Sequence, residues 1–407
     1  MSGRLGIFDA YGVEIEYAIV DADSLDVRPV ADRLLEAVGG EAASDLERGP
    51  IAWSNELALH VLELKTNGPA PDLTALPERF AADVRVATEA LDGLSARLLP
   101  GGMHPWMDPA RETVLWPHEY NEVYRTFDRI FGCSGHGWTN LQSVHVNLPF
   151  GDDEEFHRLH AAIRLVLPLT PALAASSPVV DGRVGDALDR RLVAYRQNSV
   201  RVPSVAGEVV PEPIDSPDAY EHEILKRIYD DLAPLDPGGI LRHEWANARG
   251  AIPRFDRGSI EIRLLDAQEC PTADLALVAA VVDSVRWVAE EIEPGEADAV
   301  PTGELAAVLD ATIRDGGAAV VEDGALRRAL RLGASGSTAA LAWSKLLDRA
   351  TRITSHPPFA SWAEDTLSGG PLAARIVSAL DESHERGRLR EVYRRLCDCL
   401  ERDARFE

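Results

Sequence analysis

Gly12-Val-Glu-Ile-Glu-Tyr-Ala-Ile-Val-Asp21 is an alternating stretch that predicts a β-strand. Its apolar members lie two residues apart, at Val13, Ile15, Tyr17 and Ile19. Successive side chains of a strand point to opposite faces, so the same strand presents Glu14 and Glu16 together on its other face. Two carboxylates on one face repel each other, and they therefore need either open solvent or a positive partner.

Two further stretches alternate in the same way. Residues 141–148 and 259–266 each predict a strand with one apolar face. The apolar faces carry Val144, Val146, Leu148, Ile260, Ile262 and Leu264. The opposite faces carry Ser143, His145, Asn147, Glu261 and Arg263. An imidazole, a guanidinium and several carboxylates on the polar faces of one sheet indicate a site for chemistry.

A fourth stretch, residues 56–65, fits either a strand or a helix. Glu56, His60 and Glu63 are spaced i, i+4 and i+7, which places them on one helix face, whereas in a strand Glu63 is out of phase. Seven residues of extended chain span about 23 Å, which is too far for Glu56 and Glu63 to bind one ion. We therefore predict a strand that is interrupted between these two carboxylates.

Helical spacing of apolar residues separates the strands. Repeats of three and four predict amphipathic helices over residues 84–98 and 275–285, and a third over 156–173 that ends at one of its prolines. The prolines of residues 203–217 predict a long loop that could close over a site as a mobile lid. Scattered strands with helices between and after them predict an α+β fold, built on an antiparallel sheet flanked by helices.

The composition of the chain changes near residue 300. Residues 293–302 have the Pro and Gly content of a linker, and strand patterns largely disappear after them. We therefore predict a catalytic domain over residues 1–292 and a mainly helical C-terminal region over 303–407, packed on that domain or near it.

Charge and length exclude several classes of function. The 407 residues include 67 acidic and 41 basic side chains, for a formal net charge of −26, which argues against binding to nucleic acid or to an anionic membrane surface. The sequence has no apolar run long enough to cross a bilayer and no secretory segment at its start, so we expect a soluble, cytoplasmic protein. The cysteines have neither metal-site nor disulfide spacing: Cys133, Cys270, Cys397 and Cys399.

A divalent cation would remove the repulsion among the carboxylates. Carboxylate oxygens with one imidazole and no nearby thiolate favour Mg²⁺, or Mn²⁺, over zinc. Mg²⁺ in such a site keeps positions that phosphate oxygens fill, which indicates ATP as the ligand. Arg263 would then neutralise charge on the transferring phosphoryl group. The sequence has no Walker A motif and no strand-linked G-x-G-x-x-G, so metals and arginines would have to hold the nucleotide.

The motifs occur in a characteristic order along the chain. They are Gly12-Val-Glu-Ile-Glu16, residues 56–66 ending in Leu-Glu-Leu-Lys-Thr, Gly102-Met-His-Pro105, Val144-His-Val-Asn-Leu148, Leu173-Ala-Ala-Ser-Ser-Pro178 and Ser259-Ile-Glu-Ile-Arg263. Over roughly residues 7–290 this series resembles the glutamate–cysteine ligase type 2 family of carboxylate–amine ligases, which has the glutamine synthetase-like fold. The resemblance implies an ATP-dependent reaction. A carboxylate, typically the γ-carboxylate of glutamate, attacks the γ-phosphate, and an amine then displaces phosphate from the acyl-phosphate.

The resemblance also implies roles for individual residues. It implies one Mg²⁺ bound by Glu16, Glu56 and Glu63. It implies a second Mg²⁺, bridging the ATP phosphates, bound by Glu14, His145 and Glu261. Arg263 resembles the arginine that contacts phosphate, so the implied catalytic residues are Arg263, Glu16 and Glu261. The sequence departs from the family pattern at His60, at Met103 and in the strand Ser143-Val-His-Val-Asn147, which has one histidine where many members have two. These departures touch the substrate side, so the identities of the acid and the amine stay open.

Other residues have two interpretations. His104, Arg249 and Arg254 are candidates for nucleotide binding, although His104 could instead be a turn residue and the arginines ordinary loop residues. His60 could be a nitrogen ligand of the Glu56 and Glu63 site, but we expect it to pack beside that site.

Two other functions fit the same sequence. One is phosphoryl transfer of the phosphagen-kinase kind, because that family shares the broader fold. The other is a non-catalytic homologue that binds a nucleotide or metabolite to regulate a partner. For the ligase the expected partners are a small amino-acid substrate and an amine, which could be cysteine, another metabolite or a peptide. Self-association into a homo-oligomer is an open alternative.

Overall fold

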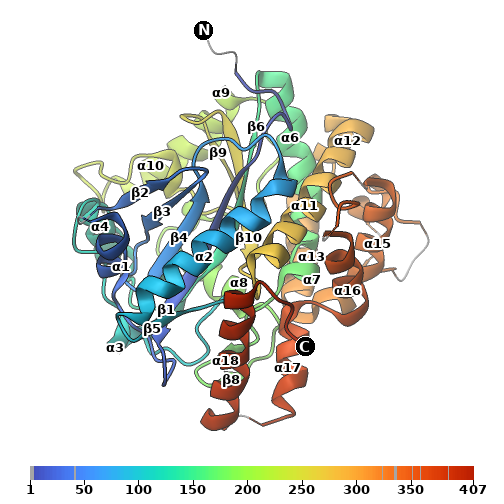
Figure 1. Ribbon diagram of the computed structural model, residues 1–407. Helices are drawn as coiled ribbons and strands as arrows, with labels where there is room; N and C mark the ends of the chain where they lie inside the picture. Colours follow the sequence, from blue (N-terminus) through green and yellow to red (C-terminus); the bar gives the residue numbers. More distant parts are fainter. Residues whose placement is uncertain are drawn as a thin grey trace.

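The fold centres on one eight-stranded sheet (Figure 1). The computed structural model describes residues 4–40, 43–322, 324–333, 337–350, 352–357, 359–383 and 385–407. The strands are β1 (Gly12–Asp21), β2 (Asp45–Arg48), β3 (Ile51–Asn55), β4 (Val61–Thr66), β5 (Ala96–Leu99), β6 (Ser143–Pro149), β9 (Ala251–Arg254) and β10 (Ser259–Asp266). Their order is β2-β3-β4-β1-β6-β10-β9, with β5 paired to the end of β1, and each of these pairs is antiparallel. The predicted α+β fold is confirmed.

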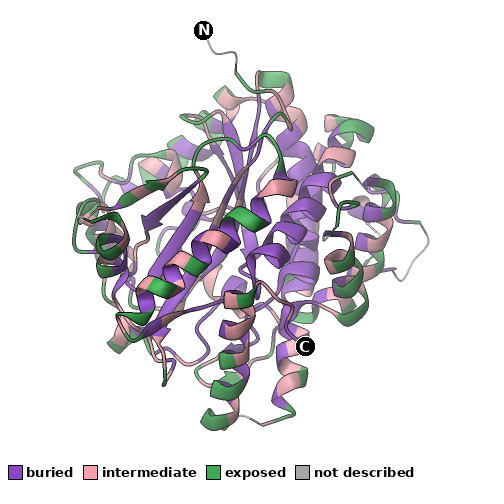
Figure 2. Ribbon diagram, viewed as in Figure 1, coloured by how far each residue is buried: buried purple, intermediate pink, exposed green. Residues whose placement is uncertain are grey.

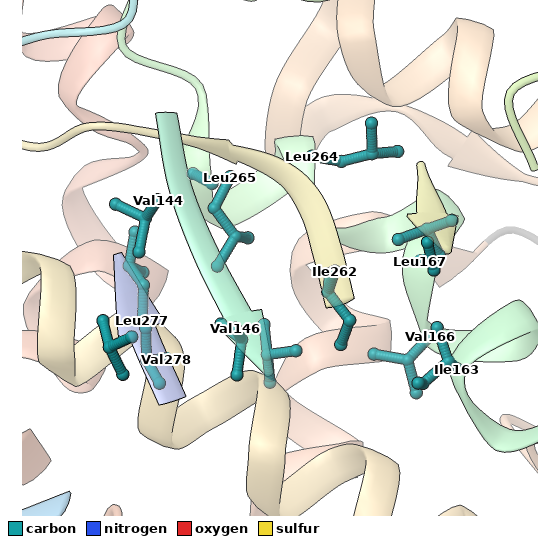
Figure 3. Packing of buried hydrophobic residues seen from close by; sticks show 14 of the residues in the cluster. Val144, Val146, Ile163, Val166, Leu167, Ile262, Leu264, Leu265, Leu277 and Val278 are labelled. Atoms are coloured by element: carbon teal, nitrogen blue, oxygen red, sulfur yellow. The ribbon is translucent and has the colours of Figure 1, made fainter. Parts of the chain in front are cut away.

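One face of the sheet is apolar and is covered by helices (Figure 1). These are α2 (Leu76–Asp92), α6 (Asp153–Val166) and α11 (Pro271–Glu291). In the close view of Figure 3, Val146 and Ile262 of the sheet lie among side chains of α11 and α6, including Val278 and Val166. Figure 2 shows the strands and α11 buried, whereas α2 also carries exposed residues on its outer side. The apolar alternation of the strands thus marks the face that packs against helices.

The helix predictions are correct in position but not always in length. α11 forms where residues 275–285 predict a helix, and α6 ends at Val166, just before the short turns η2 (Leu167–Leu169) and α7 (Pro171–Ala174). The helix predicted over residues 84–98 is too long, because α2 ends at Asp92 and Leu98 belongs to β5. Gly93 is the residue that follows the helix.

The long loop predicted over residues 203–217 is present and much of it is buried, while its closing over a site as a mobile lid stays a prediction. This segment begins with the short turn η3 (Pro203–Val205) and then packs into the interior, where Val209, Val210 and Ile214 are buried. Exposed lids make few buried apolar contacts, whereas this segment contributes side chains to the main core.

The segment predicted as a linker, residues 293–302, contains helix α12 (Pro294–Asp298) beside α6. The fully buried guanidinium of Arg164, in α6, fixes it there by donating to the backbone oxygens of Ala297 and Val300. These residues therefore do not form a flexible linker.

The chain after α12 is mainly helical. It contains α13 (Thr302–Asp315), η6 (Gly316–Ala318), β11 (Val320–Val321), α14 (Ala325–Ala329), β12 (Ser337–Thr338), α15 (Ala339–Ala350), α16 (Phe359–Gly369), α17 (Leu372–Leu380) and α18 (Arg386–Arg402). α15 and α16 pack on α11, and α18 packs on β5 and α2. The division into two domains at residue 292 stays a prediction, and these contacts join the helical region to the helices that cover the sheet.

Shorter elements surround the polar face and edges of the sheet. They are α1 (Ala31–Gly39), η1 (Leu73–Ala75), α3 (Pro109–Glu112), α4 (Asn121–Phe131), α5 (His136–Thr139), β7 (Val179–Val180), β8 (Arg183–Val184), α8 (Arg190–Tyr195), α9 (Pro217–Tyr220), η4 (Glu221–Leu225), α10 (Lys226–Leu232) and η5 (Glu244–Ala246). Within the described ranges, none of the helices has both the length and the apolar character needed to cross a membrane.

The core assignment predicts the effect of a leucine truncation. Leu148 is fully buried in β6, so Leu148→Ala should lower the free energy of unfolding by about 2–5 kcal/mol through lost burial and a residual cavity. The matched change Leu341→Ala, at a side chain 45% exposed on α15, should change it by less than about 0.5 kcal/mol. Urea denaturation followed by circular dichroism measures both. Equal losses would contradict the assigned core.

Candidate active site

The polar face of the sheet forms the floor of a cavity of about 700 Å³. The predicted site residues that line it are Glu14, Glu16, Glu56, Glu63, His145, Arg254, Glu261 and Arg263. The sheet register explains why they meet. Glu14 lies directly opposite His145, and Glu16 lies opposite Glu63, on neighbouring strands. Side chains opposite each other across an antiparallel pair point to the same face, so alternation within each strand gathers the polar residues there.

The first group is the carboxylate cluster, made of Glu16, Glu56 and Glu63. Each of these residues has a carboxylate oxygen within 4.8 Å of one from both of the others. β3 ends at Asn55 and β4 begins at Val61, so Glu56 lies on the turn between them. The predicted interruption of this strand is confirmed.

Burial and repulsion disturb the ionisation of this cluster. Burial raises the pKa of Glu56 well above its usual value, and the charges of Glu63 and Glu16 raise it further. Burial also raises the pKa of Glu16, with Glu63 adding to the effect and His145 partly opposing it. Three carboxylates whose oxygens lie close enough to share one ligand, with the pKa of Glu16 and of Glu56 raised, fit a hard divalent cation such as Mg²⁺.

The second group is the histidine cluster, made of Glu14, Glu63 and His145, whose ligand atoms also lie within 4.8 Å of one another. His145 Nδ1 is 3.2 Å from Glu14 Oε2, and its Nε2 is 2.9 Å from Ser143 Oγ. Burial lowers the pKa of His145, but the hydrogen bond to Glu14 and the charges of Glu16 and Glu261 outweigh this and raise it. The imidazole therefore balances the acids around it.

Glu261 is held differently from the other acids. Arg254 donates to Glu261 Oε2 over 2.9 Å, and Arg263 Nε donates to Oε1. Burial raises the pKa of Glu261, but the charges of Arg263, His145 and Arg254 lower it far below its usual value. His145 Nδ1 is 3.9 Å from Glu261 Oε1, so Glu261 lies beside the histidine cluster, while its oxygens already have arginine partners.

Several cations of this cavity were not predicted from the sequence. Lys65, Arg191 and Arg257 line it together with Arg254 and Arg263. Lys65 Nζ is 3.2 Å from Glu63 Oε1, and Arg257 is 3.4 Å from Glu14 Oε1. Lys65 could have been found, because it follows Glu63 by two residues on the same strand face. Arg191 and Arg257 come from a helix and a loop, where no alternation marks them.

Two residues predicted to bind nucleotide do not line the cavity. His104 is buried, and its Nε2 is 2.8 Å from the carbonyl oxygen of Leu25. Arg249 is buried in a bidentate ion pair with Glu212, at 2.6 and 2.7 Å. Neither side chain is placed to contact a ligand in this cavity.

His60 is fully buried and is not among the cavity residues, although the turn that carries Glu56 continues to it. Burial lowers the pKa of His60 to about 4, so the ring is neutral at physiological pH. Whether it acts as a metal ligand stays untested, and its burial agrees with a packing position.

Aromatic side chains also line the cavity. Phe127 of α4 has its ring centroid 5.3 Å from that of Trp138 and 5.9 Å from that of Trp245, which lie on α5 and η5. Tyr124 adds a hydroxyl that accepts a hydrogen bond from Asn55. These residues were not predicted, because they come from short elements without a periodic pattern. The cavity therefore joins a charged floor to an apolar wall.

The raised pKa values of Glu16 and Glu56 predict how Mg²⁺ and pH act on stability. Burial holds the pKa of Glu56 above the usual 4.5 in the folded protein. Such a carboxyl lowers the free energy of unfolding as the pH rises from 4.5 through the folded pKa. In EDTA, Glu56→Gln should therefore raise the melting temperature, more at pH 8 than at pH 5. Adding MgCl₂ should raise the melting temperature of the wild type at pH 8, and much less that of Glu56→Gln.

Differential scanning fluorimetry measures these shifts. The control is Glu89→Gln, at an exposed position of α2, which should behave as wild type in EDTA and in MgCl₂. Equal MgCl₂ shifts in wild type and Glu56→Gln would show that this carboxylate does not bind the cation.

The sequence profile of glutamate-cysteine ligase family 2 (GCS2) matches residues 10–394. An uncharacterized protein of Archaeoglobus fulgidus is 34% identical over 305 residues, covering 75% of this chain and 80% of the relative.

Two solved structures have a similar fold. A crystal structure of glutamate–cysteine ligase from Francisella tularensis in complex with AMP has a TM-score of 0.63 at 12% identity, covering 97% of this chain and 89% of that one. A bifunctional glutathione synthetase from Pasteurella multocida has a TM-score of 0.64 at 14% identity, and this chain spans 53% of its length. At 12% and 14% identity, these two similarities show a shared fold and nothing further. The profile match extends beyond the predicted landmarks into the helical region, and this chain therefore belongs to glutamate-cysteine ligase family 2, as an ATP-dependent ligase.

Proposed function

We propose that this protein joins the carboxylate of glutamate, or of a related amino acid, to an amine through an acyl-phosphate, using ATP and Mg²⁺. The observation that carries the proposal is that the carboxylate cluster and the histidine cluster share Glu63. Two groups of ligand atoms around one common carboxylate suit two neighbouring divalent cations. Paired cations can bind both the phosphates of a nucleotide and the substrate carboxylate.

The residues present fit two Mg²⁺ sites, although the second differs from the implied one. The carboxylate cluster would hold one ion, and the histidine cluster the other, with Glu261 next to it. Mg²⁺ bound there would neutralise phosphate charge and orient the reacting oxygens. Mn²⁺ has similar ligand preferences and could replace it.

The protein side chains contribute charge and position. Arg263 lines the cavity with its guanidinium held by Glu261, so it is oriented before a substrate arrives. We assign it the phosphoryl group, whose negative charge it would stabilise during transfer. Arg254 makes the second bond to Glu261 and is the remaining predicted nucleotide contact that lines the cavity.

The proposed chemistry proceeds in two steps. A carboxylate oxygen attacks the γ-phosphorus, the bond to the β–γ bridging oxygen breaks, and ADP leaves. The amine nitrogen then attacks the acyl carbon, the acyl–oxygen bond breaks, and phosphate leaves while the nitrogen gives up a proton. The aromatic wall of Phe127, Trp138 and Trp245 can shield the acyl-phosphate from water, which would otherwise hydrolyse it.

A phosphate-release assay with ATP, MgCl₂, glutamate and a panel of amines tests this proposal. We expect phosphate release that depends on both glutamate and one class of amine, with an amide as the product in mass spectrometry. Cysteine, other small amines and peptide amines form the arms of the panel. A phosphorylated product without amide would favour a phosphotransferase, and ATP binding without any product would favour a regulator.

Variants of the site connect the activity to these residues. Glu16→Gln and Glu261→Gln should each lower amine-dependent phosphate release about a hundredfold or more, because one removes a carboxylate of the proposed metal site and the other frees Arg263. Glu89→Gln, on the exposed side of α2, should keep wild-type turnover. Unchanged turnover in either site variant, with native circular dichroism, would remove that residue from the mechanism.

A further inference from the structure

Two motifs of the sequence have no role in the chemistry described so far. They are Gly102-Met-His-Pro105 and the Ser-Ser-Pro run at 176–178. Both meet the same side chain, Asp266, which is fully buried at the end of β10. Asp266 does not line the cavity, but it lies directly behind a residue that does.

A β-bulge brings Asp266 to the polar side of the sheet. In the ladder between β10 and β6, Glu261 is opposite Asn147 and Asp266 is opposite Ser143, so five steps on β10 match four on β6. In a regular strand, residues five apart point to opposite faces. The extra residue between Ile262 and Leu265 reverses the phase, and Asp266 therefore points to the same side as Glu261.

The two motifs bind the carboxylate of Asp266 and leave it no spare space. Its Oδ2 accepts hydrogen bonds from Ser176 N at 2.8 Å and from Ser177 Oγ at 2.7 Å. Gly102 N donates to Ser176 Oγ over 2.8 Å. A Cβ atom on Gly102 would lie 2.4 Å from Asp266 Cγ, so only glycine fits there. The position and rotamer of Asp266 are therefore fixed.

The remaining oxygen of Asp266 holds Arg191, whose side chain is 2% exposed and lines the cavity. Arg191 Nε donates to Asp266 Oδ1, and the backbone N of Arg191 donates to Ser177 Oγ at 3.0 Å. Asp189 caps the start of α8 by accepting from Leu192 N at 2.8 Å, which fixes the helix that carries Arg191. The backbone N and the side-chain Nε of Arg191 are thus both held by hydrogen bonds.

The two terminal nitrogens of the Arg191 guanidinium reach the backbone of Arg263. Both terminal guanidinium nitrogens of Arg191 lie 3.4 Å from the carbonyl oxygen of Arg263. Arg263 is in the bulge, where the regular pairing to β6 is interrupted, while its N–H donates to the carbonyl oxygen of Gly250 at 2.9 Å. Its carbonyl therefore accepts from the Arg191 side chain at the point where the ladder is irregular.

We propose that Arg191 is a positioning residue: anchored by Asp266, it holds the bulged backbone of Arg263 and so sets the direction of the Arg263 side chain. The inference rests on the proposed contact of Arg263 with the phosphoryl group. It gives the two unexplained motifs a common purpose, since both fix Asp266. Without this support the bulged backbone of Arg263 could shift, and the hydrogen bond to Glu261 alone would hold its guanidinium in the cavity.

A double-mutant cycle tests the coupling. Arg191→Met should lower kcat for phosphate release about ten- to a hundredfold in the wild-type background, with KM for ATP and glutamate changed by less than about threefold. In the Arg263→Lys background the same change should cost less than about threefold, because the residue that Arg191 positions is already gone. Equal losses in both backgrounds would overturn the proposal.

The control is Arg164→Met. Arg164 is an equally buried arginine that donates to backbone oxygens, but it lies away from the cavity. It should lower the melting temperature and leave the same fractional loss of kcat in both backgrounds. If Arg191→Met does not fold, Arg191→Lys replaces it, because an ammonium that pairs with Asp266 cannot also present two donors to the Arg263 carbonyl.

Arginine-detected NMR tests the same point without turnover. The Nε–H resonance of Arg263 is assigned by its loss in Arg263→Lys. Arg191→Met and Asp266→Asn should shift or broaden it, and Arg164→Met should not. An unchanged Arg263 resonance in both Arg191→Met and Asp266→Asn would overturn the positioning role. A shifted resonance in a protein that forms no amide would instead retain the positioning role and reject the ligase function.

Discussion

Mutual repulsion between carboxylates on one face of the sheet is the constraint on which the rest of this structure depends. The two parts of the polar face differ in how this repulsion is reduced. Around Glu14 and Glu261 the protein supplies its own positive charge, through His145, Arg254 and Arg263. The carboxylate cluster has less internal compensation, and the pKa of two of its members rises as burial and repulsion add together. The site is therefore electrostatically unequal: the protein balances part of the charge around the histidine cluster, whereas the carboxylate cluster depends more on an external cation.

The periodicity of the sequence predicted the part of the site that lies on strands. Because the side chains of a strand alternate, Glu14, Glu16, His145 and Glu261 could be placed on one face before their strands were known to be neighbours. The same reasoning with chain length predicted the break after Glu56. These inferences depend on local geometry, which short stretches of sequence determine.

The remaining features depend on tertiary packing, which a single sequence specifies only weakly. Leu94 and Leu98 continue the helical spacing of α2, but the chain ends the helix at Asp92 and gives Leu98 to a strand, since both positions are apolar in either structure. Arg249 was predicted as a nucleotide contact from its position in the sequence, but it forms an ion pair with Glu212, which is distant in the sequence. The bulge in β10 turns Asp266 to the polar face of the sheet, and no residue pattern in the sequence predicts this bulge.

The net charge of −26 shows why a global quantity cannot replace the geometry of a site. By itself it disfavours anionic ligands, yet the cavity gathers Lys65, Arg191, Arg254, Arg257 and Arg263. Each of these cations is paired with a carboxylate of the protein, so the cavity offers little free positive charge to a triphosphate. A nucleotide must either displace these acids from their partners or arrive with cations that occupy the acids. The second route costs less for the acids that line the cavity, because divalent ions satisfy them while their cationic partners are released to contact phosphate. Arg191 keeps its bond to Asp266, which does not line the cavity.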